Sequence, residues 1–339
     1  MSRGDTSVDT METVMNKDAI GISLDLINRH YQEPNRNRYE GKYFWEELYP
    51  LISASGFRAI EIPYEPVWQF GGRSGVPMNR YCINTKYQSA ASYRDVLRQS
   101  GIDRVVGVTF DPNLFMRNDN LGFFFGASGH FAGEALAHAA DLGADYFAIS
   151  PSAFYGRMAH YHPDLDAKME DIVARVTELL QGLAAKAQEV GVTLVLRNEY
   201  WSLFRGERIL PLLDALPESV TLDVDTATLT IAGVSPAAFI GAHIGRIGCV
   251  HLTDTDFVDT DETWKSPNPE FPAGRATQVF RDPGTGSVDL SRIVQLLDDL
   301  GYDGPVVCSA RQTRDPFRAL LRTRAFLNQL PNQAGRSAL

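Results

Sequence analysis

Three residues of the types that bind divalent metal ions recur at a constant interval in the second half of the chain. Glu199, Asp225 and His251 follow one another at steps of 26 residues. Each comes at or near the end of an apolar, β-rich run, where a polar side chain is costly unless it is paired or functional. Two carboxylates and one imidazole are ligands suited to Mn²⁺, Mg²⁺, Co²⁺ or Zn²⁺. If the fold brings the three run ends together, the spacing predicts a divalent-metal site.

The alternative for each acid is an ion pair with a nearby arginine. Arg197 precedes Glu199 by two residues, so an extended strand places both side chains on one face. Arg311 ends another apolar run. The two guanidinium groups could clamp an anionic substrate group, stabilise an enolate oxygen, or neutralise Glu199 and Asp225 in a metal-free pocket. We assign Glu199, His251 and Arg197 as the candidate catalytic residues.

Other polar and aromatic side chains that follow β-rich runs are candidates for contacts with a substrate. Two histidines lie in the segment FYGRMAHYHPD after the fourth such run. An imidazole titrates near neutral pH and can move a proton, although a loop histidine is more often an exposed surface residue. The predicted substrate-binding residues are Glu61, Trp68, His160, His162 and Arg311.

Eight units, each a short β-rich run followed by a helical pattern, must position these residues. Strands are predicted at 19–26, 57–64, 104–110, 145–150, 192–200, 220–227, 249–256 and 305–311. Helices are predicted at 45–56, 85–101, 134–143, 164–191, 207–216, 235–245, 289–301 and 315–330. Alternating α/β units with nearly continuous apolar strands favour a parallel sheet, and eight of them fit a single closed (β/α)8 TIM barrel. A doubly wound open sheet is disfavoured because no G-x-G-x-x-G motif follows the first strand.

The barrel is expected to span residues 19–330, between a flexible N-terminal tail at 1–18 and a C-terminal tail at 331–339. Long inserts follow the second, third and seventh strands, at 65–84, 111–130 and 257–288. They would lie as βα loops on the C-terminal face, where the active sites of such barrels form. Their aromatic residues favour lids or binding loops over local disorder.

Composition and charge narrow the classes of partner. The chain has 339 residues, 44% of them hydrophobic, and a net charge of −10. These values are typical of a globular protein and disfavour nucleic-acid binding, which needs clustered Lys and Arg. The three cysteines suit a reducing compartment. No apolar stretch is long enough for a membrane span and no signal peptide is evident, so a cytoplasmic protein that does not bind membranes is expected.

Four segments carry a resemblance to a known family. They are GVTLVLRNEY, LDVDTATLTIAG, GCVHLTDTD and DPFRALLRTRAFL. In order and rhythm they resemble the xylose-isomerase-like superfamily of sugar phosphate isomerases and epimerases, over about residues 19–330. The resemblance implies a TIM barrel in which Asp225, His251 and Glu199 bind a divalent metal, foremost Mn²⁺. It also implies a small carbohydrate or cyclitol substrate and proton abstraction next to a carbonyl.

Two departures from the family pattern bear on the reaction. Thr228 stands where the family often has a histidine, and strand eight lacks the glutamate that is the fourth ligand. Arg311 or Gln312 occupies that region, so Gln312 is the remaining candidate ligand. Arg197 could also take the place of the strand-five glutamate. Without the second glutamate, a two-base epimerisation is hard to run. A one-base lyase or dehydratase reaction is then favoured, similar to C-glycoside deglycosidases or inosose dehydratases.

A second hypothesis belongs to a different class of protein. If the ligand positions are degraded, the chain is a metal-free barrel that binds a carbohydrate or serves as a non-catalytic subunit. Members of a family of this kind often form oligomers, so the resemblance leaves open a homo-oligomer or a complex with a second subunit.

Overall fold

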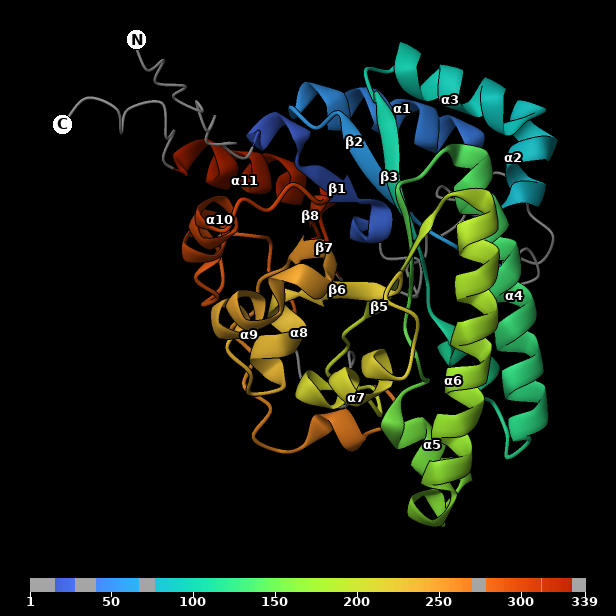
Figure 1. Ribbon diagram of the computed structural model, residues 1–339. Helices are drawn as coiled ribbons and strands as arrows, with labels where there is room; N and C mark the ends of the chain where they lie inside the picture. The colour runs from blue at the N-terminus through green and yellow to red at the C-terminus, as the bar shows by residue number, and fades with distance from the viewer. Residues whose placement is uncertain (1–15, 28–40, 67–76, 270–278, 312, 331–339) are drawn as a thin grey trace, which may run out of the picture.

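Residues 16–27, 41–66, 77–269, 279–311 and 313–330 are described by a computed structural model of the chain. Within them, eight parallel strands close into a barrel in sequence order (Figure 1). This confirms the predicted (β/α)8 fold. The strands are β1 Gly21–Ser23, β2 Ala59–Pro63, β3 Arg104–Phe110, β4 Tyr146–Ile149, β5 Thr193–Arg197, β6 Thr221–Asp225, β7 Ile247–Leu252 and β8 Val306–Cys308. Trp68, Gln312 and most of the two expected tails lie outside the described residues, so the domain limits stay predictions.

Alternation along the strands sorts their side chains between the lumen and the surrounding helices. One buried cluster fills the lower lumen; its members are Ala59, Val106, Tyr146, Ala148, Val195, Cys249 and Val307. Two residues further along their strands come Glu61, Arg197 and His251. Because every second side chain of a strand faces the same way, these three share the lumen one layer nearer the C-terminal mouth.

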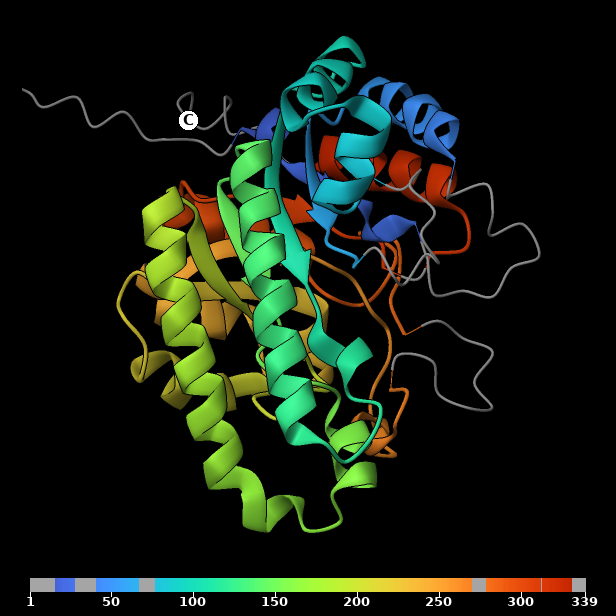
Figure 2. The same ribbon diagram turned by 90° about the vertical axis from the view of Figure 1, so that its right-hand side faces the viewer.

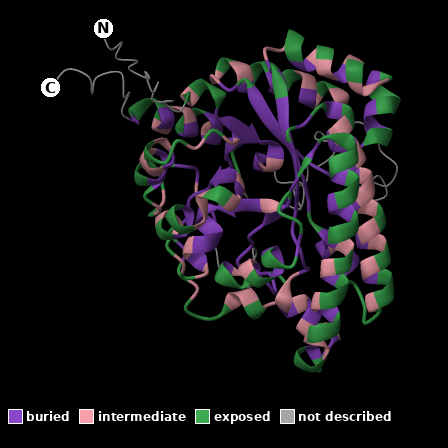
Figure 3. Ribbon diagram, in the orientation of Figure 1, coloured by how far each residue is buried: buried purple, intermediate pink, exposed green. Residues whose placement is uncertain are grey.

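Helices cover the outside of the barrel, with α4 and α6 lying side by side along one flank (Figures 1 and 2). The longer helices are α1 Lys42–Ala54, α3 Ala90–Gln99, α4 Leu121–Leu142, α6 Leu165–Val190, α10 Leu290–Asp299 and α11 Pro316–Gln329. The shorter ones are α2 Arg80–Tyr87, α5 Tyr155–Tyr161, α7 Ile209–Asp214, α8 Thr226–Ile231 and α9 Pro236–His243. Buried side chains line the inner faces of the helices, and exposed ones face outward (Figure 3). Across the described part of the chain, no helix has both the length and the apolar character needed to cross a membrane.

The insert expected as a loop at 111–130 is partly helical, which corrects that prediction. It holds a 3-10 turn at Pro112–Phe115 and the first turns of α4, whose N-cap Asn120 accepts a hydrogen bond from the Phe123 amide at 2.9 Å. Phe115 stacks on Phe131 with ring centroids 5.2 Å apart. Aromatic burial of this kind offsets the low helix propensity of the glycines that made the segment look like a loop.

A second correction concerns the helix predicted at 85–101, which is two helices. Gln88 has a positive φ of 71° and ends α2. The Ser89 side chain then caps α3 by accepting from the Ser92 amide at 3.1 Å. The polar cap and the left-handed residue turn the chain between helices, which the apolar period alone does not reveal.

Two strands end earlier than predicted because a polar side chain caps the turn that follows. Ser23 ends β1, and its hydroxyl accepts from the Asp25 amide at 3.3 Å. Asp225 ends β6 and caps α8, accepting from the Thr228 amide at 3.0 Å. These caps fix Asp25 and Asp225 at the C-terminal rim of the barrel, where reactive side chains of this fold usually lie.

The described parts of the insert after β7 are tied to the barrel by one carboxylate. Asp254 accepts hydrogen bonds from the backbone amides of Thr255, Gly284, Gly286 and Val288, at 2.8–3.1 Å. A side chain at Gly286 would collide with Asp254, since a Cβ there would lie 2.3 Å from its Oδ1. Asp254 therefore has a structural role, and the proposed lid or binding role of the insert stays a prediction.

Gly107 makes room for the Tyr146 ring, which fills the lumen below the polar layer. A Cβ at Gly107 would lie 2.2 Å from that ring. We expect Gly107→Ala to force the ring aside and to lower the free energy of unfolding by about 1–3 kcal/mol, measured by urea denaturation. Gly126→Ala is the control, because a Cβ there meets nothing within 4 Å. Equal effects of the two substitutions would contradict this account.

His138 on α4 predicts a pH dependence of stability. Burial lowers the pKa of His138 from 6.5 to about 3. Below pH 6.5, His138 of the unfolded chain binds a proton that the folded chain does not bind. The free energy of unfolding therefore falls as pH drops from 6.5 toward 3, by at most about 1.4 kcal/mol per pH unit. We expect His138→Leu to flatten the fall between pH 6.5 and about 5. His130→Leu, on the exposed side of the same helix, should leave the slope unchanged.

Candidate active site

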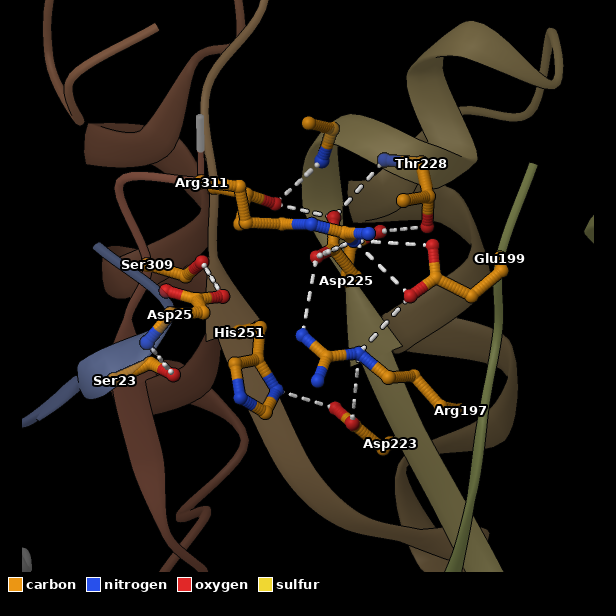
Figure 4. A network of polar contacts seen from close by, with 12 residues as sticks. Ser23, Asp25, Arg197, Glu199, Asp223, Asp225, Thr228, His251, Ser309 and Arg311 are labelled. Carbon is orange, nitrogen blue, oxygen red and sulfur yellow. Dashed lines mark hydrogen bonds and ion pairs between the residues drawn. The ribbon is translucent and has the colours of Figure 1, made fainter. Parts of the chain in front are cut away.

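A network of charged side chains fills the upper lumen of the barrel (Figure 4). Its charged members lie in or just after β1, β2, β5, β6, β7 and β8, so residues far apart in sequence meet there. The charged members are Asp25, Glu61, Arg197, Glu199, Asp223, Asp225, His251 and Arg311. The structure thus brings together six residues predicted from the sequence, namely Glu61, Arg197, Glu199, Asp225, His251 and Arg311.

His251 is held between two carboxylates at the bottom of this network. Its Nε2 lies 2.7 Å from Oε2 of Glu61, and its Nδ1 lies 2.5 Å from Oδ1 of Asp223. All three side chains are buried. Burial by itself lowers the pKa of His251, but the carboxylates of Asp223 and Glu61 outweigh it and raise the pKa well above 6.5. Both ring nitrogens face carboxylate oxygens, and this arrangement favours the charged form of the imidazole.

Glu61 is saturated with donors. Ser23 Oγ donates to its Oε1 at 2.6 Å, and Tyr146 Oη donates to its Oε2 at 2.6 Å. Burial would raise the pKa of Glu61, yet His251, with smaller contributions from Arg197 and the Ser23 hydroxyl, lowers it to about 2. A carboxylate held this firmly is a poor base. Glu61 therefore serves to orient His251, and its predicted role as a substrate contact stays untested.

Arg197 lies above His251 and joins three carboxylates. Its Nε lies 3.2 Å from Glu199 Oε1 and 3.7 Å from Asp223 Oδ2, and its Nη2 lies 3.9 Å from Asp225 Oδ2. Only 8% of its side chain is exposed. Burial opposes its charge, but the surrounding carboxylates raise the pKa of Arg197 further above its usual range. The guanidinium is thus a fixed positive charge inside the barrel.

Arg311 closes the network from the segment after β8. Its Nη1 lies 3.0 Å from both carboxylate oxygens of Glu199 and 3.6 Å from Oδ2 of Asp225. The guanidinium also packs over the Phe280 ring, 4.5 Å from its centroid. Stacking on a ring and pairing with acids hold the group in one orientation. Arg311 is more exposed than the other members on this side, at 12%, and so faces a substrate most readily.

Asp25 enters the site from the wall opposite Glu199. In an eight-stranded barrel with strands in sequence order, β1 and β5 lie across the lumen from each other. Ser309 Oγ donates to Oδ2 of Asp25 at 2.7 Å, while Oδ1 has no hydrogen-bond partner among the described residues (Figure 4). Burial raises the pKa of Asp25 more than Arg197 lowers it. This carboxyl group therefore holds a proton more readily than an ordinary aspartate.

The metal ligands expected from the sequence do not offer the donors that a metal ion needs. Glu199 faces the two guanidinium groups. Asp225 Oδ1 accepts from the Thr228 amide and from the Thr253 hydroxyl. Both nitrogens of His251 are engaged by carboxylates. Oδ2 of Asp225 has no hydrogen-bond partner among the described residues, but it faces guanidinium nitrogens at 3.6 and 3.9 Å. As arranged here, Glu199, Asp225 and His251 do not fit a divalent cation.

One other group of potential ligands exists among the described residues, formed by Asp223, Cys249 and His251. Their donor atoms lie within 4.8 Å of one another, and all three residues are buried. However, His251 Nδ1 and Asp223 Oδ1 are 2.5 Å apart, whereas two ligands on a tetrahedral Zn²⁺ are about 3.3 Å apart. Burial also raises the pKa of the Cys249 thiol to about 11, which disfavours the thiolate that a metal requires. In this arrangement the group is a hydrogen-bonded cluster.

The remaining predicted residues lie away from the network or outside the described residues. His160 is exposed on α5 and packs edge-on against Tyr161. His162 is buried at the end of α5, and its Nδ1 lies 3.3 Å from the Lys168 amino group. Among the described residues, no hydrogen bond or ion pair joins either histidine to the network. Trp68 and Gln312 are not among the described residues.

The selection of site residues by sequence missed several members of the network. The predicted site residues do not include the polar residues Asp25, Asp223 and Ser309. They also do not include the two hydroxyl donors to Glu61, Ser23 and Tyr146. The alternation of side chains along each strand could have identified them, because every second residue faces the lumen. Asp223 precedes Asp225 by two residues, and Tyr146 faces the same lumen as Glu61. Any polar residue whose side chain faces the lumen is a candidate site residue, whether or not it lies at the end of its strand.

Comparison with known proteins matches residues 50–330 to the family described as xylose isomerase-like TIM barrel. The inosose dehydratase of Lacticaseibacillus casei is 27% identical over 170 residues, which cover 48% of this chain and 56% of that protein. The inosose dehydratase of Erwinia tasmaniensis is 33% identical over 95 residues, covering 27% of this chain and 32% of that protein. The chain thus spans about half the length, or less, of these curated relatives.

Solved structures show the same fold across nearly the whole chain. A probable 3-DHS dehydratase from Bacillus anthracis superposes with a TM-score of 0.65 at 12% identity, covering 92% of this chain and 99% of that one. An L-ribulose 3-epimerase gives 0.65 at 16% identity, covering 94% and 96%. At these identities the two structures show that the chain shares their fold. With most of its length matched by the family model, the chain belongs to the xylose isomerase-like TIM barrel family.

Proposed function

We propose that this chain is a dehydratase-like lyase that removes a proton next to the carbonyl of a keto-sugar or keto-cyclitol and expels a neighbouring hydroxyl as water. The observation that carries the proposal is the placement of Asp25 and Glu199 on opposite walls of the lumen, with Arg197 and Arg311 beside them. Elimination needs a base, an acid and a positive charge near the developing oxyanion. The site holds one group for each.

Glu199 is the proposed base. Its carboxylate faces two guanidinium groups, at 3.2 Å and 3.0 Å, which favour its charged form. Those same cations weaken it as a base, so its proton transfer depends on Arg311 turning toward the substrate oxygen as charge develops there. Arg311 is suited to this because it is the more exposed of the two arginines. A guanidinium beside the enolate oxygen lowers the barrier to removal of the proton.

Asp25 is the proposed acid. Its raised pKa and its unpartnered Oδ1 suit a carboxyl group that gives a proton to a leaving hydroxyl. In the proposed step, Glu199 takes the proton from carbon, the electron pair forms the carbon–carbon double bond, and the carbon–oxygen bond breaks as Asp25 protonates the leaving oxygen. Water and an unsaturated carbonyl compound result, so atoms and charge balance.

The curated relatives named above support this choice over epimerisation. They are inosose dehydratases, and one structural neighbour is also a probable dehydratase. An epimerase would return the proton from a second strong base on the opposite face. Asp25, with its raised pKa, keeps its proton to higher pH than an ordinary aspartate, which is what the proposed acid needs. Metal dependence, expected from the sequence, is not part of this proposal, while the cytoplasmic location and any oligomer or second subunit stay predictions.

The first test replaces the base. With a panel of inososes and other keto-sugars, we expect Glu199→Gln to lower kcat for loss of water by about 10²–10⁴-fold, since proton abstraction then has no base. Product formation is measured by mass spectrometry as loss of one water. Glu189→Gln, exposed on α6, is the control and should keep wild-type activity. If wild-type protein bound a keto-sugar but never turned it over, the non-catalytic alternative would be favoured.

The second test separates the acid from the base. We expect Asp25→Asn to slow elimination while the substrate still exchanges its carbon-bound proton for deuterium from solvent, because Glu199 still works. In the wild type, activity should fall as pH rises through the raised pKa of Asp25, and this limb should vanish in the variant. Asp166→Asn on α6 is the control. Equal loss of exchange and elimination in Asp25→Asn would argue against an acid role.

A further inference from the structure

Glu199 and Asp225 are the two acids that the sequence places at the metal position, and each contacts the same two arginines. Glu199 lies 3.2 Å from Arg197 and 3.0 Å from Arg311. Asp225 lies 3.9 Å from Arg197 and 3.6 Å from Arg311. The space between the two carboxylates is therefore bounded by guanidinium nitrogens on both sides (Figure 4).

Several other atoms that a metal ion would use already accept or make hydrogen bonds. Oδ1 of Asp225 caps α8 and accepts from the Thr253 hydroxyl. Both ring nitrogens of His251 contact carboxylates of the barrel wall. At the strand-eight position there is no acid, and Ser309 contacts Asp25 instead. Oδ2 of Asp225 has no hydrogen-bond partner among the described residues, and it faces Arg197 at 3.9 Å and Arg311 at 3.6 Å. The atom that remains open to a cation is therefore the one that faces the two guanidinium groups.

We infer that the guanidinium groups of Arg197 and Arg311 take the place of the divalent cation, so that this barrel works without a metal ion. Two arginines supply two positive charges, the same charge as one Mn²⁺ or Mg²⁺. Unlike a metal, these charges are covalently attached and remain ionised at all working pH values. The inference concerns metal binding alone and stands whether or not the reaction proposed above is right.

Exchange of the arginines for a metal ion is energetically unfavourable. Their side chains are 8% and 12% exposed, and Arg311 is further held against the Phe280 ring. A metal ion entering between Glu199 and Asp225 would force a guanidinium out of these contacts or leave it beside another cation. Removing one partner from a buried ion pair is strongly destabilising, because it leaves an uncompensated charge. The bound arginines therefore exclude the metal by charge as well as by space.

If the proposed function also holds, the cation that stabilises the enolate oxygen is Arg311. Guanidinium donors pair well with a planar enolate or carboxylate, whereas a metal ion acts as a Lewis acid through its open positions. This role of Arg311 rests on the proposed reaction. It implies a substrate whose carbonyl oxygen lies within hydrogen-bond reach of Arg311, and an activity that persists in the presence of a chelator.

The direct test is titration of the purified wild-type chain with MnCl₂, followed by electron paramagnetic resonance of free Mn²⁺ and by isothermal titration calorimetry. We expect a Kd weaker than about 1 mM. Elemental analysis of the protein as purified should give far less than one equivalent of Mn, Co, Zn or Fe. One equivalent bound with micromolar affinity, and lost in Glu199→Gln, would overturn the inference.

Removing the arginines should create the site that they block. We expect Arg311→Gln, and more strongly Arg197→Gln combined with Arg311→Gln, to bind Mn²⁺ at least tenfold more tightly than wild type and to gain Tm on adding it. Arg281→Gln, which breaks an ion pair with Asp256 near the surface, is the matched control and should gain nothing. Folded variants that bind no more Mn²⁺ than wild type would also overturn the inference. Should the variants fail to fold, the wild-type titration decides alone.

Discussion

Arg197 lies with its guanidinium among Glu199, Asp223 and Asp225, where little solvent reaches. Each of these carboxylates would be prohibitively costly to bury alone, and the arginine would be equally costly without them. The same reciprocity holds one layer below, where His251 joins Glu61 to Asp223. The buried acids and bases of the lumen are therefore stable only when all of them are present together. Every later feature of the site, including the orientation of Glu199 and Arg311, depends on this matching of buried charges.

The barrel provides the geometry for that matching at low cost. Neighbouring parallel strands place their lumen-facing side chains in common layers. Side chains from β2, β5, β6 and β7 therefore meet without any long loop reaching inward. Caps at the strand ends then turn the chain. Asp225 is both the last residue of β6 and the cap of α8, which leaves only Oδ2 facing the arginines. Local backbone needs therefore limit what this carboxylate can do in the site.

This chain has the framework of its family, and two arginines bring positive charge to its centre. The relatives that the comparisons name include dehydratases and epimerases on one barrel, consistent with chemistry that is set by a few lumen residues. In this chain an arginine on β5 and another after β8 bring positive charge to the centre from within the polypeptide. A fixed guanidinium cannot leave, change oxidation state or exchange ligands. It can donate hydrogen bonds in a set direction, which suits stabilisation of an oxyanion.

The sequence by itself determined the barrel, because the repeated α/β period is a local signal carried by every unit. It also identified Glu199, Asp225, His251, Arg197 and Arg311 as strand-end residues that should converge. It did not reveal that the segment 111–130 begins a helix, since buried aromatic packing there outweighs glycine propensity. Nor did it decide whether the acids face a metal or the arginines. That choice depends on distances of a few ångströms across the lumen, between residues on different strands, and only the tertiary structure sets them.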